Sequence, residues 1–509
     1  MKSITKRKFF KFLSRISTIH GLNYISDRKT SKKSKIFWIT AFILSFLGCF
    51  FFFLQVYEKV FVVPDMSAKI TYEPFVLHPF PAITICPYNK LPYKASKIAD
   101  LLEKLDSSEL TADEELQLEI SSQTCQKMTY NSENIVSNFS EINIVDYLSK
   151  IQFNKSEIIP KFILGDHINQ TDPFLTRVFT CNGFCVTFNQ LDFDEIFTNE
   201  IHDDFKVYSH GRKSNWTLAN GYTYPDEPGL YPIQMSFSSS NTFNAILIQN
   251  KMNIDEQCRP FRRGFEIYFH LPNEILTPFA PSINLNNINK DNLIQFKAES
   301  FEMSSDMKTY SVEARQCYFY AERNLQFFKS YTENNCQIEC LSNKTIEQCG
   351  CAKYHMPRGK DTRICMGNDS VCVSKVDADH DLKIDYYSCD CYPPCTDLKY
   401  ELFSWTDADL DDGFSLGDHF NLDDLNNVSD RKITTLITIK NAITPLLLRT
   451  SFSAYQMQQF ISDFGGLLSL AMGCSILSIV ELIYNAFNIK NEPDDEDDDE
   501  ENLKNCKTN

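Results

Sequence analysis

The sequence lacks the short motifs on which most enzymes depend. It has no HExxH zinc motif, no Walker loop, no GxSxG elbow and no GxGxxG dinucleotide fingerprint. Its nine histidines are scattered, and no two of them lie within four residues of each other. Acidic runs at residues 409–412 and 423–424 could bind calcium, but they lack the glycine spacing of calcium loops and are more typical of solvated loops. We therefore expect no enzyme, no cofactor and no metal site.

The sequence also lacks an excess of basic residues. Lys and Arg number 50 against 67 Asp and Glu, so the formal net charge is -17, which argues against nucleic-acid binding. The charge is distributed unevenly along the chain. Residues 1–35 hold eleven basic residues and one acidic residue, whereas residues 491–509 hold nine acidic and two basic residues. We expect a basic N-terminal segment, residues 1–35, and an acidic tail, residues 488–509.

Charged residues are absent from residues 36–57, which read IFWITAFILSFLGCFFFFLQVY. A helix of this length rises about 33 Å, enough to cross a hydrocarbon core of about 30 Å. The run is too long and starts too late for a signal peptide, and it is unusually aromatic for a buried core helix. Because five basic residues stand at positions 28–35, the positive-inside rule places the N-terminus in the cytosol.

A second segment with few charges, residues 450–487, predicts another transmembrane helix. From 450 to 480 its only charged residue is Asp463. Two spans would return the acidic tail to the cytosol. That tail does not follow the positive-inside tendency, so the predicted orientation depends on the first span.

Small residues recur along the second segment at intervals of four, three and four: Ser462, Gly466, Ser469 and Gly473. This pattern alone favours close helix packing, because it lines one helix face with small side chains. Carboxylates inside membranes, however, usually face water or a partner, and Asp463 opens the same helix. Further along, Gly473, Cys474 and Ser475 could let backbone carbonyls and a hydroxyl approach a narrow axis and replace an ion's hydration shell. One such chain cannot enclose a pore, but several copies around an axis can.

Residues 58–449 have the marks of an extracellular domain. This region holds fifteen of the 18 cysteines, which favours disulfides over zinc outside the cell. It also holds all seven glycosylation sequons, at Asn138, Asn154, Asn169, Asn215, Asn343, Asn368 and Asn427. Periodicity predicts helices over residues 96–119 and 322–349, the latter broken at 334–335. Alternating apolar residues predict strands at 83–86, 186–188, 246–249, 265–269 and 433–439.

Several motifs in this order resemble the degenerin/epithelial sodium channel superfamily, over roughly residues 17–484. His20-Gly21 is similar to its His-Gly motif, and residues 80–86, FPAITIC, are similar to its FPAVTxC signature. The cysteine pattern of residues 336–395, which includes His355-Met-Pro, resembles that of its thumb. Asp463-Phe-Gly-Gly and Gly473-Cys-Ser resemble its pore helix and Gly-x-Ser filter.

The resemblance implies an α+β membrane protein in which two transmembrane helices flank a disulfide-rich extracellular domain with palm, β-ball, knuckle, finger and thumb. It implies a trimer in the plasma membrane, with both termini cytosolic. It also implies the pairs Cys86–Cys185, Cys317–Cys395, Cys336–Cys391, Cys340–Cys389, Cys349–Cys372 and Cys351–Cys365. We further expect a finger pair, Cys125–Cys181, which leaves Cys258 as the odd thiol of this domain.

The resemblance also assigns site residues. Gly473, Cys474 and Ser475 would form the selectivity filter. Ser462 would be the degenerin position, where bulky side chains hold channels open, and Asp463 would stand at the outer pore mouth with Gly466 and Ser469 along the same helix. His20 and Gly21 would form a cytosolic re-entrant loop that affects open probability.

The function implied is an amiloride-sensitive, sodium-permeable channel opened by an extracellular ligand. The histidine pair that follows the first span in proton-gated members is absent, since Asp65 and Met66 stand there, and Arg315 lies near the position of a family tryptophan. The low glycine content and the Asn, Lys and Ile bias favour an invertebrate member, and we favour the RFamide-neuropeptide-gated, cnidarian type. The alternatives are a proton-gated or constitutively active member, an ATP-gated receptor, or a two-span scavenger receptor for lipid that has no pore.

Overall fold

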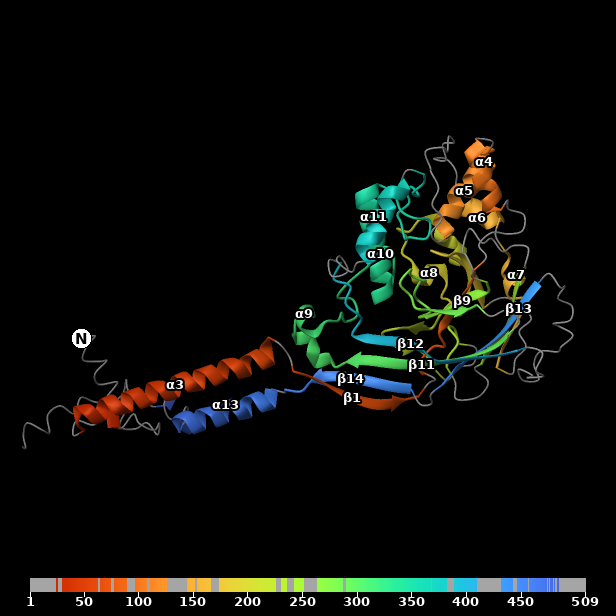
Figure 1. Cartoon of the computed structure of the whole chain (residues 1–509). Coiled ribbons are helices and arrows are strands. Elements are labelled where there is room, and N and C mark those ends of the chain that lie inside the picture. Colours follow the sequence, from red (N-terminus) through yellow and green to blue (C-terminus); the bar gives the residue numbers. More distant parts are fainter. Residues whose placement is uncertain are drawn as a thin grey trace, which may run out of the picture. The chain divides into compact units, whose positions relative to one another are not determined.

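The computed structural model describes residues 24–25, 30–62, 65–74, 77–88, 97–107, 110–125, 144–151, 153–165, 174–225, 230–235, 242–250, 263–286, 290–367, 369–381, 389–409, 432–442, 446–455, 457–473, 475, 477–478, 480 and 483–484. The chain divides into two compact units (Figure 1). The helix unit comprises residues 1–67, 305–315 and 452–509, and the sheet unit comprises residues 68–304 and 316–451.

The helix unit is built around one long apolar helix. Its elements are α3 (Lys32–Phe61), η6 (Ser305–Thr309), α9 (Val312–Arg315) and α13 (Met457–Met472). Within the described residues, α3 is the one helix long and apolar enough to cross a membrane. It contains the whole predicted span 36–57 and extends beyond it at both ends. Ser31 caps its first turn by accepting a hydrogen bond from the N–H of Ser34 at 3.3 Å.

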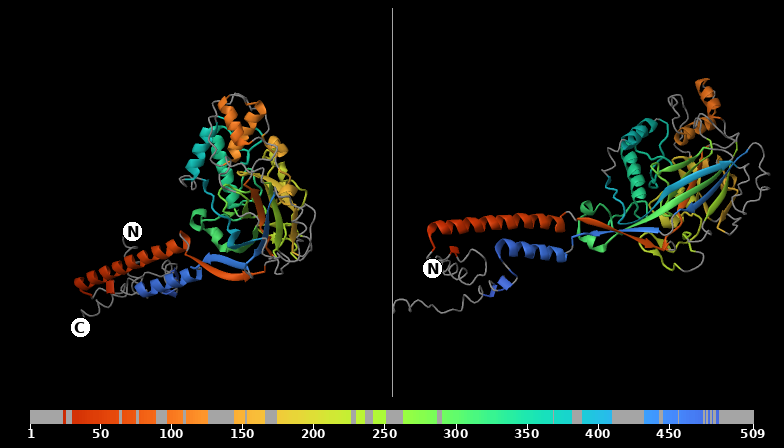
Figure 2. Two further views of the ribbon diagram at one scale, coloured as in Figure 1. Left: turned by 45° about the vertical axis from the view of Figure 1, so that its right-hand side comes forward. Right: turned by 60° about the horizontal axis from the view of Figure 1, so that its bottom comes forward.

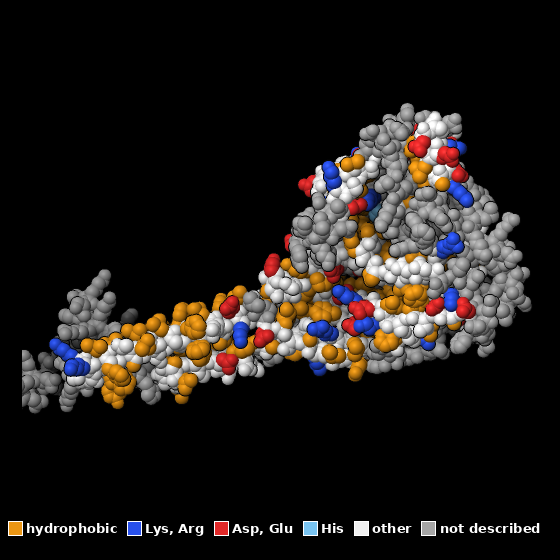
Figure 3. Space-filling model, in the orientation of Figure 1, with side chains coloured by type: hydrophobic (Ala, Val, Ile, Leu, Met, Phe, Trp, Pro, Cys, Tyr) orange, Lys and Arg blue, Asp and Glu red, His pale blue; other side chains and the backbone are white. Residues whose placement is uncertain are grey.

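Helices α3 and α13 pack together through aromatic side chains. The ring of Phe53 lies 5.2 Å from that of Phe464, and Phe61 lies 5.7 Å from Phe460. Both views in Figure 2 show the two helices alongside each other. Figure 3 shows apolar side chains along the length of α3. Only Cys49 and Val60 of α3 are buried within this chain, so most of this apolar surface needs lipid or another chain to cover it.

The sheet unit contains two large sheets. The seven-stranded sheet has the order β1-β14-β11-β13-β8-β3, with β12 paired to the other edge of β11. Its strands are β1 (Met66–Glu73), β3 (Lys161–Leu164), β8 (Phe243–Asn250), β11 (Lys290–Met303), β12 (Thr396–Asp409), β13 (Lys432–Asn441) and β14 (Leu446–Ser453). The long strand β11 pairs in parallel with β13 over its first half and with β14 over its second half.

The five-stranded sheet is antiparallel throughout, in the order β10-β9-β2-β5-β4. Its strands are β2 (Ala82–Pro87), β4 (Leu175–Thr180), β5 (Gly183–Phe188), β9 (Phe265–His270) and β10 (Ser282–Leu285), and a small ladder joins β6 (Trp216–Thr217) to β7 (Gly221–Tyr222). The five strands predicted from alternating apolar residues all fall within β2, β5, β8, β9 and β13, and are confirmed.

A continuous apolar core lies between the two large sheets. Aromatic residues on or just before strands of the two sheets meet in the middle: Phe80 lies 5.3 Å from Phe296, and Phe188 lies 4.5 Å from Phe243, measured between ring centroids. All four side chains are almost completely buried. Such aromatic pairs add to the free energy gained from the buried area, so this core holds the two sheets as one body.

The sheet unit also contains the helices α4 (Ile98–Ser107), α5 (Ala112–Thr124), α6 (Ile144–Ile151), α7 (Lys155–Ile158), α8 (Phe193–Ile196), η3 (Asp203–Tyr208), α10 (Glu333–Cys349) and α11 (Asp369–Asp381), most of which pack into a second apolar cluster beside this core. The predicted single helix 96–119 is wrong, because Thr111 starts a new helix with a capping box to Glu114. The predicted helix 322–349 is also too long: α10 begins only at Glu333, and Thr332 caps it by accepting from the N–H of Asn335.

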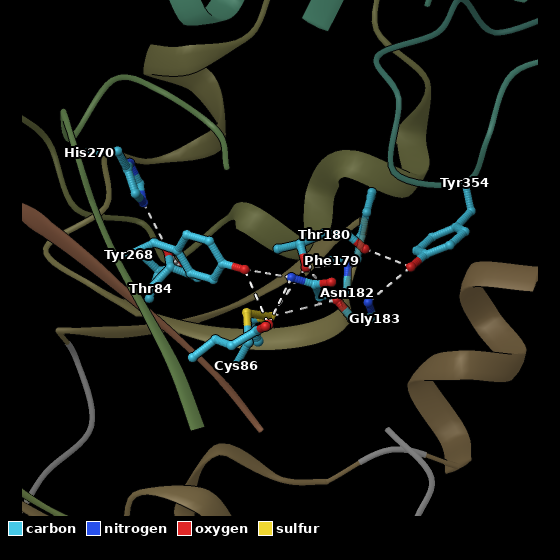
Figure 4. Close-up of a disulfide and its surroundings, with 12 residues drawn as sticks. Thr84, Cys86, Phe179, Thr180, Asn182, Gly183, Tyr268, His270 and Tyr354 are labelled. Atoms are coloured by element: carbon cyan, nitrogen blue, oxygen red, sulfur yellow. Dashed lines mark hydrogen bonds between the residues drawn. A yellow bond between two sulfur atoms is a disulfide. The ribbon is translucent and has the colours of Figure 1, made fainter. Parts of the chain in front are cut away.

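Six predicted disulfides form in the structure: Cys86–Cys185, Cys317–Cys395, Cys336–Cys391, Cys340–Cys389, Cys349–Cys372 and Cys351–Cys365. Figure 4 shows Cys86, which forms a disulfide with Cys185 and so links β2 to β5 covalently, and the hydrogen bonds around it. The hydroxyl of Tyr354 donates to the carbonyl of Thr180 at 2.6 Å and accepts the N–H of Gly183 at 3.0 Å.

The predicted finger pair Cys125–Cys181 is wrong. Cys125 is disulfide-bonded, but Cys181 is not in a disulfide. Cys181 lies in the tight turn between β4 and β5, where Thr180 pairs with Gly183. The antiparallel register of this hairpin fixes where its thiol lies, and residue spacing along the chain does not reveal that register. Cys258 lies outside the described residues.

Candidate functional site

The predicted pore residues lie on or directly after α13. Ser462, Asp463, Gly466 and Ser469 are within the helix, and no residue of α13 is buried within this single chain. The predicted transmembrane segment 450–487 is not one continuous helix in the structure. Residues 450–453 belong to strand β14, and the helix stops at Met472. At sixteen residues α13 rises about 24 Å.

The helix ends because Gly473 adopts a left-handed backbone conformation, with φ of 62°. Glycine tolerates this conformation without a steric penalty, and it is the residue most often found there after a helix. The N–H of Gly473 still donates to the carbonyl of Ser469 at 2.9 Å. The turn therefore closes the helix and redirects the chain at the predicted filter.

Two serines organise the chain after this turn. The N–H of Ser475 donates to Oγ of Ser478 at 3.2 Å, and the N–H of Ser478 donates to Oγ of Ser475 at 3.2 Å. This reciprocal arrangement caps a second helical stretch that includes Leu477 and Ser478. Cys474, the middle residue of the predicted filter, lies outside the described residues.

A large open cavity of about 1070 Å³ lies beside α13 within the helix unit. It is lined by Phe52, Gln55, Val56, Glu58 and Lys59 of α3, by Asp65 and Tyr455, and by Ser462, Asp463, Gly466, Leu467 and Leu470 of α13. A Cβ added at Gly466 would meet open space, so glycine here is not needed for packing within the chain. The structure thus brings three predicted residues to one cavity and leaves Ser469 out of its lining.

The lining of this cavity is acidic. Three of its residues carry carboxylates, Glu58, Asp65 and Asp463, against the single ammonium group of Lys59. The hydroxyl of Tyr455 donates a hydrogen bond to the carboxylate of Asp463. A cavity with a surplus of carboxylates raises the local concentration of cations. Tyr455 was not predicted, and no spacing pattern in the sequence marks it.

A second hydroxyl that the predictions missed belongs to α3. Oγ of Ser45 donates to the backbone carbonyl of Ala471, near the end of α13. A hydroxyl inside an apolar run is the signal that could have found it, because such groups in membrane helices can bond to a neighbouring helix.

The sheet unit holds a smaller cavity of about 420 Å³, whose lining includes Phe269, His270, Thr277, Phe279 and Gln337. Close by in sequence, the carboxyl of Glu274 is buried, and burial raises its pKa to about 7. It accepts hydrogen bonds from the N–H of Leu271 and the amide of Asn334, at 3.2 and 3.1 Å. Burial also lowers the pKa of His270 to about 4, so this imidazole is neutral at physiological pH.

Other predicted site residues fall in different places. Asn154 and Asn343 are exposed and Asn215 is half-buried, while the remaining four sequons lie outside the described residues. His20 and Gly21 also lie outside them.

Comparison with known proteins identifies the family. The amiloride-sensitive sodium channel family matches residues 13–485. Pickpocket protein 28 of Drosophila melanogaster is 24% identical over 489 residues, which cover 92% of this chain and 76% of that protein. The sodium channel protein Nach of Drosophila melanogaster is 22% identical over 490 residues, which cover 92% of this chain and 85% of that protein. Human acid-sensing ion channel 2 is 26% identical over 172 residues, 32% of this chain and 31% of that channel.

The chain therefore belongs to the amiloride-sensitive sodium channel family. Proteins of this family are ion channels of the plasma membrane, and they assemble as multimers that conduct sodium. The predicted superfamily is confirmed.

Proposed function

We propose that this protein is one subunit of a trimeric, amiloride-sensitive, ligand-gated channel for sodium. The turn at Gly473 carries the proposal, because it ends an exposed helix beside an acidic cavity and redirects the backbone where a filter would need its carbonyls. Membership of the sodium channel family supports the same conclusion.

In the proposed channel, α3 is the first span, and α13 with the residues that follow it is the second. Three copies of α13 surround the pore. This arrangement gives the exposed residues of α13 a partner, since Ile461 and Leu470 are 59% and 90% exposed in the single chain. Backbone turns at membrane depth are tolerated only where protein or water covers them, and a central pore supplies both. Both termini then lie in the cytosol and residues 58–449 lie outside the cell.

Within this pore, Gly473, Cys474 and Ser475 form the selectivity filter. Ser462 and Asp463 stand nearer the outer mouth, where the carboxylates of the cavity attract cations before they reach the filter. His20 and Gly21 act from the cytosolic side on the open probability.

The opening ligand is proposed to be an extracellular neuropeptide of the amidated, RFamide type. The absence of the histidine pair after the first span argues against gating by protons alone, because Asp65 and Met66 occupy that region. The ligand would move the thumb, which includes α10 and α11, and the thumb would pull on the spans.

Voltage-clamp recording from cells that express the full chain tests the proposal. A panel of amidated neuropeptides should evoke an inward sodium current that amiloride blocks, whereas acid steps alone should evoke little current. Silence with every peptide and in every combination with related subunits would contradict the channel function.

A substitution at Ser475 separates a channel from a scavenger receptor of similar plan. In a channel, Ser475→Ala should change the ratio of sodium to potassium permeability, because the hydroxyl lies at the filter. In a lipid receptor without a pore, lipid uptake should be the activity observed, and the substitution should leave it unchanged.

A further inference from the structure

The end of α13 presents a hydrogen-bonding problem. In an uninterrupted helix each carbonyl accepts the N–H four residues later, so the carbonyl of Ala471 would accept from the N–H of Ser475. In this structure the N–H of Ser475 donates to Oγ of Ser478 at 3.2 Å. The turn at Gly473 therefore withdraws the ordinary donor of Ala471 from the helix.

The hydroxyl of Ser45 supplies a replacement. Its Oγ donates to the carbonyl of Ala471 from the facing helix α3, in the middle of an otherwise apolar stretch. In a hydrocarbon environment an unsatisfied backbone carbonyl is strongly destabilising, because no water can take the place of the missing donor. A broken α13 with Ser45 in place is therefore favoured over a broken α13 without it.

We infer that Ser45 is a positioning residue for the selectivity filter: its hydroxyl holds the carbonyl of Ala471 and so keeps α13 broken at Gly473. This inference rests on the proposed channel function. Ser45 does not line the cavity beside α13, and it acts only through the backbone two residues before Gly473. Its removal frees α13 to continue its helix, which would withdraw the carbonyls that the filter presents to ions.

The same helix contains a matched control. Oγ1 of Thr40 donates to the carbonyl of Ile36 at 2.9 Å, within α3 itself. Thr40→Val removes a hydroxyl from the same helix at nearly constant volume but touches no bond to α13. Ser45→Ala removes the bond to Ala471, and Ser45→Thr keeps a hydroxyl there.

The first measurement is the sodium-to-potassium permeability ratio, taken from reversal potentials and limited to variants that reach the cell surface. For Ser45→Ala we expect the ratio to fall about fivefold, the equivalent of one ordinary hydrogen bond. Thr40→Val should match the wild type, and Ser45→Thr should recover much of the ratio. Equal ratios in the wild type and Ser45→Ala, or equal shifts in Ser45→Ala and Thr40→Val, would overturn the inference.

A density map of the full-length protein in lipid nanodiscs provides a readout that needs no current. The wild type should show α13 ending at Met472, and Ser45→Ala should show the helix continuing through residue 475. An unchanged break in Ser45→Ala overturns the inference even if the channel conducts. A silent wild type would instead count against the proposed function, while the map would still decide the role of Ser45.

Discussion

Tyr455 donates a hydrogen bond to the carboxylate of Asp463, which lies eight residues further along the chain and two turns into α13. The bond links the segment before the helix to the acidic cavity beside it, and both residues line that cavity. A hydrogen bond to an ionised group is stronger than one between neutral groups, so Tyr455 both orients this carboxylate and occupies part of its capacity to bind cations.

Loss of the Tyr455 hydroxyl should strengthen block by external calcium. In Tyr455→Phe the carboxylate of Asp463 no longer shares its charge with a phenol, and we expect the half-blocking calcium concentration to fall roughly fivefold. Asp463→Asn should raise that concentration instead. Calcium dose–response curves on peptide-evoked currents provide the measurement, and identical curves for Tyr455→Phe and the wild type would contradict this role.

A bulky group at Ser462 should hold the channel open. Ser462 lines the cavity and is exposed, so a cysteine there can be reached by a thiol reagent. Treatment of Ser462→Cys with a bulky methanethiosulfonate should produce a sustained current. The matched control is Ser469→Cys, on the same helix but outside the cavity lining. If labelling of Ser462→Cys is confirmed by mass and the current is unchanged, the assignment of this residue to the gate is wrong.

The buried carboxyl of Glu274 should make stability fall as pH rises. Burial raises its pKa from 4.5 to about 7, so the folded state holds this proton more tightly than the unfolded state. The associated stability is fully present below pH 4.5 and is lost as the pH rises through 7. The carboxylate of Asp397 contributes to the shift, and the amide of Asn334 opposes it.

The neighbouring His270 works in the opposite direction. Its pKa is lowered from 6.5 to about 4, so its unfolded state binds the extra proton and stability rises with pH between these values. The contribution of Glu274 is therefore clearest between pH 6.5 and 8. As the pH rises over this range, the wild type should lose unfolding free energy that Glu274→Gln keeps. The whole shift in the pKa of Glu274 corresponds to up to about 3 kcal/mol, and this range covers part of it. Melting of the full-length protein in detergent at pH 6.5 and pH 8 measures this difference, and an equal change of stability in the two proteins would refute the role of Glu274.

Cys181 should react with a thiol reagent without prior reduction. It is not in a disulfide, whereas Cys125 is disulfide-bonded. Alkylation of the unreduced protein in denaturant, followed by peptide mass spectrometry, should label Cys181 and leave Cys125 unlabelled until a reductant is added. Recovery of a disulfide-linked peptide pair that contains Cys125 and Cys181 would contradict the structure, in which Cys181 is not in a disulfide.

Disulfide loss should affect stability only at paired positions. Cys86→Ser breaks the link between β2 and β5, which closes a separation of 99 residues, and we expect a loss of about 2–5 kcal/mol. Cys181→Ser, only a few residues from Cys185 in the same hairpin, should change stability far less. If both variants lose the same unfolding free energy, the loss cannot be assigned to the Cys86–Cys185 disulfide, and the prediction is wrong.

Patterns of apolar, β-branched and charged residues along the chain were enough to predict several helices and strands from the sequence by itself. The apolar run of residues 36–57 predicted α3, because a stretch without charges can satisfy its backbone only as a helix in lipid. Strands such as β2 and β9 followed from β-branched and aromatic residues. The resemblance to one family supplied six disulfide pairs, which spacing alone leaves open among many connectivities. The start of α5 also has a sequence signal, since Thr111 and Glu114 have the spacing of a capping box.

Only the tertiary structure decided the features that depend on two distant segments. The partner of the Ala471 carbonyl comes from Ser45, 426 residues away in the chain. Cys181 stands in the turn of the β4–β5 hairpin and forms no disulfide, and burial raises the pKa of Glu274. Helix and strand periods report which face of an element is apolar, but they carry no information on what lies opposite that face. Hydrogen-bond partners and burial are set by that opposing surface, so they become definite only when the chain has folded.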